Sequence, residues 1–255
     1  MSWLRSGPPT RTVEVARDLV LTDGTALRVR WVRDARARRL RLIVTDKGVR
    51  LTLPLRASER LALAFLHEHR DWLQAQLDKR PDLDAAPFSP DTDRALLLRG
   101  IWLPLHWREG RYLRLEQGDD GISVHRPARA SARQLHAAFK DFYLQQARLD
   151  VGRWLPMYVG GLPQGPSALR IRALSSLWGS LSPSNALSLD LALVLGRPSA
   201  FEYVLVHELC HLLHRDHSRR FWREVEARWP QWRDERAYLH GDGLALKAEL
   251  RRCIP

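Results

Sequence analysis

The segment His-Glu-Leu-Cys-His at residues 207–211 carries three side chains that could do chemistry, two imidazoles and one carboxylate. If the segment is helical, the four-residue spacing places the imidazoles of His207 and His211 one turn apart on one face, where both can bind one metal ion. Glu208 lies about 100° around the helix, so it can take a proton from water without being a ligand itself. The pattern predicts a catalytic zinc site.

The residues around this pattern predict that its helix is buried. The segment FEYVLVHELCHLLH, residues 201–214, is apolar almost all round when drawn as a helix. Burying ionisable groups without partners costs on the order of several kcal/mol, and a bound metal ion removes this cost. The alternative is a core helix whose two histidines are hydrogen-bonded and whose glutamate is ion-paired.

A third protein ligand is expected from the residues that follow. His214 falls on the same face as His207, but on a straight helix it lies about 10 Å farther along the axis. Both nitrogens cannot then lie about 2 Å from one zinc. His217 precedes a helix cap in an expected turn, where the chain can fold back, so we prefer it. Asp216 and Cys210 remain alternatives, although such residues are more often a turn residue and a small buried thiol.

Strand patterns dominate the first half of the chain and helix patterns the second, which is typical of an α+β fold. Alternating apolar residues indicate a small antiparallel meander over residues 27–31, 40–44 and 49–53. Further short strands are expected over residues 96–98, 102–107, 112–115, 122–125, 169–173 and 186–191. We divide the chain into a flexible lead-in over 1–20, an N-terminal β-rich region with one helix over 21–130, and a metal-binding region over 131–255.

Capping residues predict where the helices begin. Ser58 can cap a helix that runs to about residue 77, and Ser131, with a glutamine three residues later, forms a capping box for a helix that ends near Trp154. Pro198 suits the first turn of the helix that carries the metal motif. Ser218 can cap the helix that follows it.

Composition limits the class of protein. The 255 residues carry a net charge of +12, a field that favours anionic partners such as nucleic acid or nucleotides. Because the arginines are scattered, we expect at most weak, nonspecific nucleic-acid binding. No run of about 18 apolar residues predicts a membrane span, no signal peptide is evident, and the two cysteines make no disulfide framework, so we expect a cytoplasmic protein. The sequence indicates no oligomeric state.

From about residue 27 to 229 the sequence resembles the YgjP-like metallopeptidase family, a zincin-type group related to the SprT-like proteins. The resemblance is strongest in HELCHLLHRDHSRRFWREVE, residues 207–226. Other matching segments are RRLRL at residues 38–42, DW at 71–72, LWGS at 177–180 and NALSLD at 185–190.

This resemblance implies that His207, His211 and His217 bind zinc and that Glu208 is the catalytic base. It also implies a zincin-like core, in which the HExxH helix packs on an antiparallel or mixed sheet. The edge strand of that sheet, near residues 186–191, would lie over the metal cleft.

The sequence departs from the family at two positions in this region. Leu177 stands where the family usually has arginine, and Leu181 stands where it usually has cysteine. If that arginine contacts the substrate, substrate binding differs here. Tyr238 and His240 are candidates for stabilising an oxyanion, because they lie downstream of the motif.

The function that fits best is a zinc metallopeptidase acting on a peptide or protein substrate. One alternative is hydrolysis of a nucleoside triphosphate such as UTP to release pyrophosphate on the same metal site, with arginines holding the anion. Another is a DNA-associated protease like the SprT-like proteins. A purely structural zinc is disfavoured, because such sites normally have four protein ligands.

Overall fold

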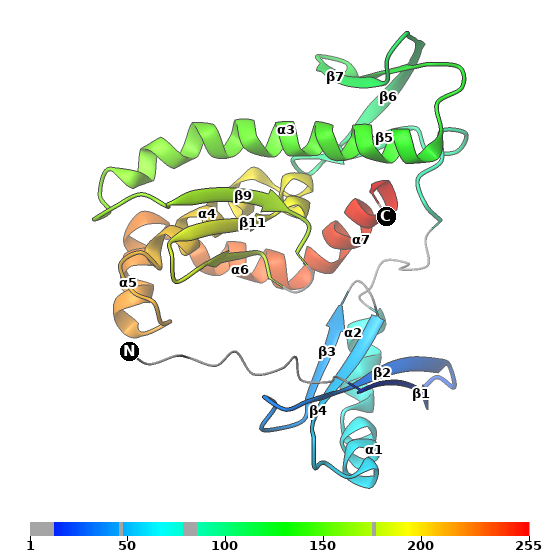
Figure 1. The fold of residues 1–255 in the computed structure, drawn as a ribbon, viewed down its shortest axis with the longest axis vertical. Helices are drawn as coiled ribbons and strands as arrows, with labels where there is room; N and C mark the ends of the chain where they lie inside the picture. The colour runs from blue at the N-terminus through cyan, green and yellow to red at the C-terminus, as the bar shows by residue number, and fades with distance from the viewer. Residues whose placement is uncertain (1–12, 46–47, 79–85, 175–176, 255) are drawn as a thin grey trace, which may run out of the picture. The chain divides into compact units, whose positions relative to one another are not determined.

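The computed structural model describes residues 13–45, 48–78, 86–174 and 177–254 (Figure 1). The predicted α+β class is confirmed, since helices and mixed sheets both occur along the chain. The chain divides into two compact units, Met1–Leu83 and Asp84–Pro255. This division differs from the boundary that we placed after residue 130.

The first unit contains a four-stranded sheet. Its strands are β1 (Val13–Val20), β2 (Ala26–Asp34), β3 (Arg41–Thr45) and β4 (Gly48–Pro54), in the order β1-β2-β4-β3. The predicted antiparallel meander is wrong, because β2 and β4 pair in parallel and β3 lies at the edge. Alternation fixes which side chains are buried but not which strand is the neighbour. Strand β1 occupies residues 13–20 of the expected flexible lead-in, and residues 1–12 of that lead-in lie outside the described residues.

Helices α1 (Glu59–Glu68) and α2 (Arg70–Asp78) share a core with this sheet. Ser58 caps α1 as predicted, and the single helix expected here is interrupted at His69. Val29, Trp31, Val49, Leu51 and Leu53 are buried in the core together with Leu66 and Leu73 of the helices. Arg28, Arg30 and Arg50 alternate with the buried strand residues, so they lie on the other face of the sheet.

The second unit begins with another four-stranded sheet. It consists of β5 (Ala95–Leu98), β6 (Ile101–Glu109), β7 (Arg114–Gly118) and β8 (Gly121–Arg126), in the order β5-β6-β8-β7. The long helix α3 (Ala132–Val159) follows, and its start has the predicted capping box at Ser131 and Gln134. It continues to Val159 instead of ending near Trp154.

A three-stranded sheet lies next to the helix that carries the HExxH motif. Its strands are β9 (Ala168–Arg172), β10 (Gly179–Leu181) and β11 (Ala186–Asp190), in the order β10-β11-β9. The prediction that residues 186–191 form the edge strand is wrong, because β11 is central and all five of its residues are buried. Strand β10 lies on the side of β11 opposite to β9. It is an edge strand of this sheet and runs antiparallel to β11.

The remaining elements are helical. They are the short 3-10 helix η1 (Leu191–Leu195), α4 (Pro198–Cys210), α5 (Arg219–Arg228), α6 (Trp232–Gly241) and α7 (Gly243–Cys253). Helix α4 begins with proline in its first turn and contacts α3, α5, α6 and β10, so it is buried as predicted. In Figure 1, β9 and β11 run side by side next to the long helix α3.

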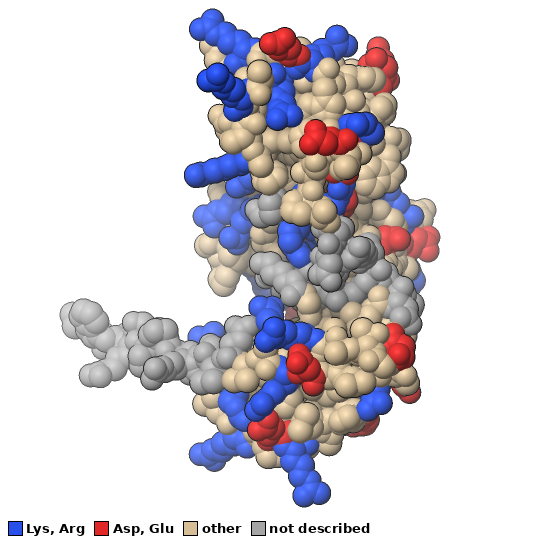
Figure 2. Space-filling model, turned by 90° about the vertical axis from the view of Figure 1, so that its right-hand side faces the viewer, with Lys and Arg blue, Asp and Glu red and all other residues tan. Residues whose placement is uncertain are grey.

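One face of the molecule shows how charged side chains are distributed. On the face shown in Figure 2, blue Lys and Arg side chains occur on both units, with red Asp and Glu side chains between them. This distribution fits the expectation that the positive charge is scattered. Within the described parts of the chain, no helix combines the length and the apolar character that crossing a membrane requires.

Candidate metal centre

Helix α4 contains His207 and Glu208 of the motif. The helix ends just before His211, which is the first residue of the following turn. Cys210 is its last residue and His211 is its C-cap. The backbone N–H of His211 donates to the carbonyl oxygens of Glu208 and Leu209, which tightens the end of the helix. The ring centroids of His207 and His211 are 5.2 Å apart.

The chain then folds back and brings a third imidazole to the pair. Asp216 accepts a hydrogen bond from the Ser218 N–H at 3.2 Å, and Ser218 caps α5. This turn places the Nε2 atom of His217 3.1 Å from the Nε2 atom of His207. One nitrogen from each of His207, His211 and His217 lies within 4.8 Å of the other two.

The spacing and the chemistry of these donors suit zinc. Nitrogens bound tetrahedrally at about 2.0–2.1 Å from zinc lie about 3.3 Å from one another, close to the separation of the His207 and His217 nitrogens. The Nδ1 atom of His211 lies 2.9 Å from the carbonyl oxygen of His214. Because a carbonyl only accepts, Nδ1 carries the proton and Nε2 keeps its lone pair for a metal.

Burial keeps two of the imidazoles neutral. Burial, together with the nearby His211, His217 and Arg236, lowers the pKa of His207 to about 3. Burial is also the main reason that the pKa of His211 is lowered. Neutral imidazole is the form that binds metal ions, so both groups are in the ligand state at neutral pH.

Two aromatic residues of α5 form a wall beside the imidazoles. The ring of Phe221 stacks on His211, with centroids 4.4 Å apart, and lies 4.9 Å from His207 and 4.8 Å from His217. The Trp222 ring lies 5.7 Å from His207. Phe221 therefore packs against all three histidine rings.

Glu208 is buried beside this ligand set, with 6% of its surface exposed. Burial raises its pKa to about 8. Gly179, the first residue of β10, lies directly against it: a Cβ atom on Gly179 would be 2.6 Å from the Glu208 Cγ and 2.8 Å from Oε1. Only glycine therefore allows β10 to approach the carboxylate this closely.

Comparison with known proteins identifies the family. The sequence pattern of the YgjP-like, metallopeptidase domain matches residues 38–242, most of the chain. The chain belongs to the YgjP-like metallopeptidase family. It is therefore a peptidase that depends on a divalent metal, and the predicted family resemblance is confirmed.

Other comparisons add little. The crystal structure of the metallopeptidase zymogen of Pyrococcus abyssi abylysin is 28% identical, over 39% of this chain and 92% of that chain, with a TM-score of 0.28. No curated protein matches the sequence.

The alternatives for the third ligand lie outside the histidine cluster of this YgjP-like protein. The expected helical extension to His214 is wrong, because α4 ends at Cys210. His214 instead contributes its backbone carbonyl to His211. Cys210 is buried in the main core, which raises the pKa of its thiol to about 11. Asp216 is exposed and bonds within the turn.

The two oxyanion candidates lie on α6. The hydroxyl of Tyr238 accepts a hydrogen bond from the Arg197 N–H at 3.3 Å, and the Arg197 guanidinium lies over the Tyr238 ring at 4.4 Å. Arg197 precedes α4, ten residues or about 15 Å along the axis from His207. Tyr238 is thus at the opposite end of α4 from the histidines. His240 is exposed near the end of α6.

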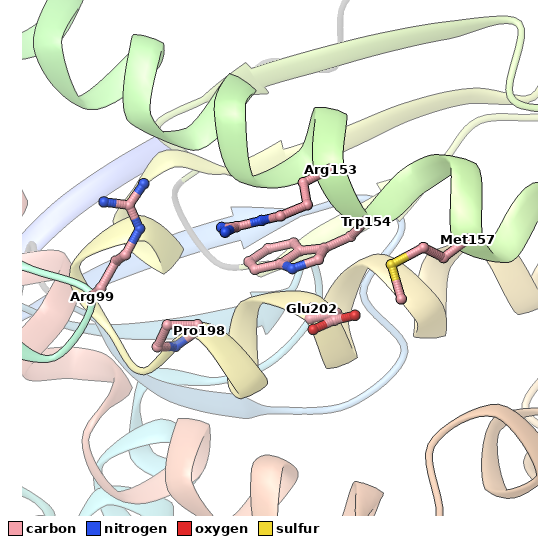
Figure 3. A pocket seen from close by; sticks show the side chains of 6 residues that line it. All are labelled: Arg99, Arg153, Trp154, Met157, Pro198 and Glu202. Atoms are coloured by element: carbon pink, nitrogen blue, oxygen red, sulfur yellow. The ribbon is translucent and has the colours of Figure 1, made fainter.

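A separate hollow of about 670 Å³ lies between α3 and the first half of α4 (Figure 3). Its lining includes none of the three histidines or Glu208, and consists of Arg99, Arg153, Trp154, Met157, Pro198 and Glu202. The two arginines both bond to Asp150, and Glu202 accepts a hydrogen bond from the Tyr158 hydroxyl. These charged groups therefore already have partners within the protein.

The close packing of Gly179 gives a first prediction. Changing Gly179 to Ala should displace the Glu208 carboxylate. If Glu208 is the base that the sequence predicts, peptidase turnover should fall by about tenfold to a hundredfold, since small misplacements of a catalytic group have such effects. Metal content should stay unchanged, because no ligand moves directly. The measurement is steady-state kinetics with metal analysis of the same samples.

Gly152→Ala is the matched control, because a Cβ atom at Gly152 in α3 meets nothing within 4 Å. It should keep full turnover. Equal turnover in Gly179→Ala and Gly152→Ala would show that the contact with Glu208 has no catalytic consequence.

Proposed function

We propose that this chain is a zinc peptidase, in which His207, His211 and His217 hold the metal and Glu208 is the general base. The observation that carries this proposal is the convergence of three imidazoles beside one buried carboxylate. Three protein ligands leave a fourth position open for water or substrate, as in catalytic zinc sites. A structural site would normally use a fourth protein ligand.

The proposed chemistry divides the work between the metal and Glu208. Bound zinc would supply a Lewis acid for the scissile carbonyl and would lower the pKa of water to roughly 7. Glu208 accepts the proton of the attacking water and passes it to the leaving amine. Burial favours the protonated carboxyl, whereas a divalent cation beside it favours the carboxylate. These opposing effects suit a group that must both accept and release a proton near neutral pH.

Strand β10 supports a peptide as the substrate. Among the described residues it pairs only with β11, so its other edge has unpaired N–H and C=O groups. An extended peptide can add to such an edge through backbone hydrogen bonds. Because Gly179 of β10 touches Glu208, a peptide bound along this edge passes next to the general base.

Nucleotide hydrolysis at the same site is the alternative. It would need cations near the metal to hold the phosphates. Arg236 is exposed, and its guanidinium lies 5.5 Å from the centre of the Trp222 ring, which in turn packs on His207. Several other arginines of this unit are instead paired with carboxylates: Arg99, Arg153, Arg197, Arg228, Arg233 and Arg252.

A comparison of substrates distinguishes the peptidase, the nucleotide hydrolase and the DNA-associated protease. The zinc-loaded protein would be incubated with casein-derived peptides and with UTP, each with and without DNA, and Glu208→Gln would be the control. We expect peptide cleavage that does not need DNA and is lost in Glu208→Gln. Glu208-dependent hydrolysis of UTP without peptide cleavage would overturn the peptidase proposal, and cleavage only with DNA would favour the DNA-associated protease.

A further inference from the structure

A buried ion pair joins the last helix to the sheet of the metal-binding region. Lys247 of α7 has 8% of its surface exposed, and Asp190, the last residue of β11, has 1%. The Lys247 Nζ donates to an Asp190 carboxylate oxygen, to the Leu174 carbonyl at 2.9 Å and to the Leu177 carbonyl at 3.1 Å. An ammonium has three hydrogens, so all of them are used.

Asp190 also forms hydrogen bonds with residues that precede β10. Its backbone N–H donates to the carbonyl of Trp178 at 2.8 Å, and its carboxylate accepts from the Leu174 N–H at 3.3 Å. The second carboxylate oxygen accepts from the Ala192 N–H at 2.8 Å. Lys247 and Asp190 together therefore fix Leu174, Leu177 and Trp178.

Trp178 carries this constraint to the strand next to the general base. The Lys247 ammonium lies 4.5 Å from the centre of the Trp178 ring. The ring also packs so closely on Gly243, the first residue of α7, that it leaves no room for a Cβ atom there. The next residue after Trp178 is Gly179, which begins β10 and touches Glu208. A continuous set of contacts thus runs from α7 to Glu208.

We propose that Lys247 is a positioning residue, which acts through Asp190 to hold β10 against Glu208. The family match ends at residue 242, so α7, which begins at Gly243, lies beyond it. The last helix of this chain would accordingly serve to brace the edge strand on which the substrate is proposed to bind. The catalytic consequence, but not the bracing itself, rests on the proposed peptidase function.

The simpler possibility is that the ion pair only stabilises the fold, so the variants must separate the two roles. Removing Lys247 alone would leave the Asp190 carboxylate buried and unpaired, which is strongly destabilising. The double variant Lys247→Met/Asp190→Asn removes both charges and keeps similar side-chain lengths, which is often tolerated. Asp190→Asn alone keeps one acceptor oxygen but leaves the Lys247 ammonium without its anion, so its unfolding transition is measured beside its hydrogen exchange.

Another ion pair of α7 offers a matched control. Arg252 pairs with Asp93 at 2.6 Å and with Glu249 of its own helix at 3.0 Å, and all three side chains are partly buried. The double variant Arg252→Met/Asp93→Asn therefore removes the ion pairs of Arg252, none of which includes Leu174, Leu177 or Trp178.

Hydrogen exchange of the full-length protein is the primary measurement. In Lys247→Met/Asp190→Asn we expect the amides of β10 to exchange at least about tenfold faster, with zinc content unchanged and turnover of the casein-derived peptides reduced by about tenfold or more. Asp190→Asn should change β10 exchange in the same direction. The Arg252→Met/Asp93→Asn control should match the original protein in β10 exchange and in turnover.

The proposal is overturned if β10 exchanges at its original rate in Asp190→Asn and in the folded double variant. It is equally overturned if the Arg252→Met/Asp93→Asn control loosens β10 to the same extent, because the effect would then be general. Failure of the original protein to cleave any peptide would count against the proposed function alone, since the exchange measurement does not depend on activity.

Discussion

Changing Glu208 to Gln is expected to lower peptide turnover by between about a hundredfold and ten-thousandfold, the contribution of a positioned general base. Glutamine has nearly the same shape, but its amide cannot accept and return the proton. Because Glu208 lies beside the ligand set and not within it, zinc content should remain at one ion per chain. Steady-state kinetics, metal analysis and circular dichroism of the same preparation would measure turnover, zinc content and folding.

Glu202 provides the matched control for this variant. It lies on the same helix, about one and a half turns before the motif, and accepts a hydrogen bond from the Tyr158 hydroxyl. Glu202→Gln should keep turnover close to that of the original protein. Near-normal turnover in Glu208→Gln on a confirmed substrate would mean that another group is the base.

Changing His217 to Ala is expected to weaken zinc binding by more than about a hundredfold, the upper end of the loss from removing an outer contact. The variant would leave only two imidazole ligands. His214→Ala should have a much smaller effect, because His214 orients His211 through its backbone carbonyl, which alanine retains. Competition of each variant with a zinc chelator at fixed pH would give the two affinities.

The comparison of these two variants decides which histidine is the third ligand. Their side chains are identical and they lie three residues apart, so general effects on the turn are similar. Equal losses of affinity, or a greater loss for His214→Ala, would reverse the assignment of His217.

The metal-binding helix could be predicted from the sequence because several local signals agree there. Pro198 marks its first turn, the apolar residues predict its burial, and the four-residue spacing sets the two histidines on one face. Ser218 marks the next helix cap, so the turn that brings His217 back to His207 and His211 could also be predicted. These features depend on residues close together in the chain.

Features that depend on contacts between residues far apart in the chain could not be predicted from the sequence. Alternation in β11 predicted a strand, but its place between β9 and β10 depends on pairing that alternation does not encode. Gly179 contacts Glu208 from 29 positions away, and Lys247 reaches Asp190 from 57 positions away. A single lysine in a helix gives no sign in sequence that its ammonium is buried.

A crystal structure of the zinc-loaded protein, with anomalous data at the zinc edge, tests the central claim most directly. We expect one zinc bound to the Nε2 atoms of His207, His211 and His217 at about 2.0–2.1 Å. Glu208 should lie near the open fourth position without being bonded to the metal. A zinc bound by His214 or by the Glu208 carboxylate in place of this set would contradict the account.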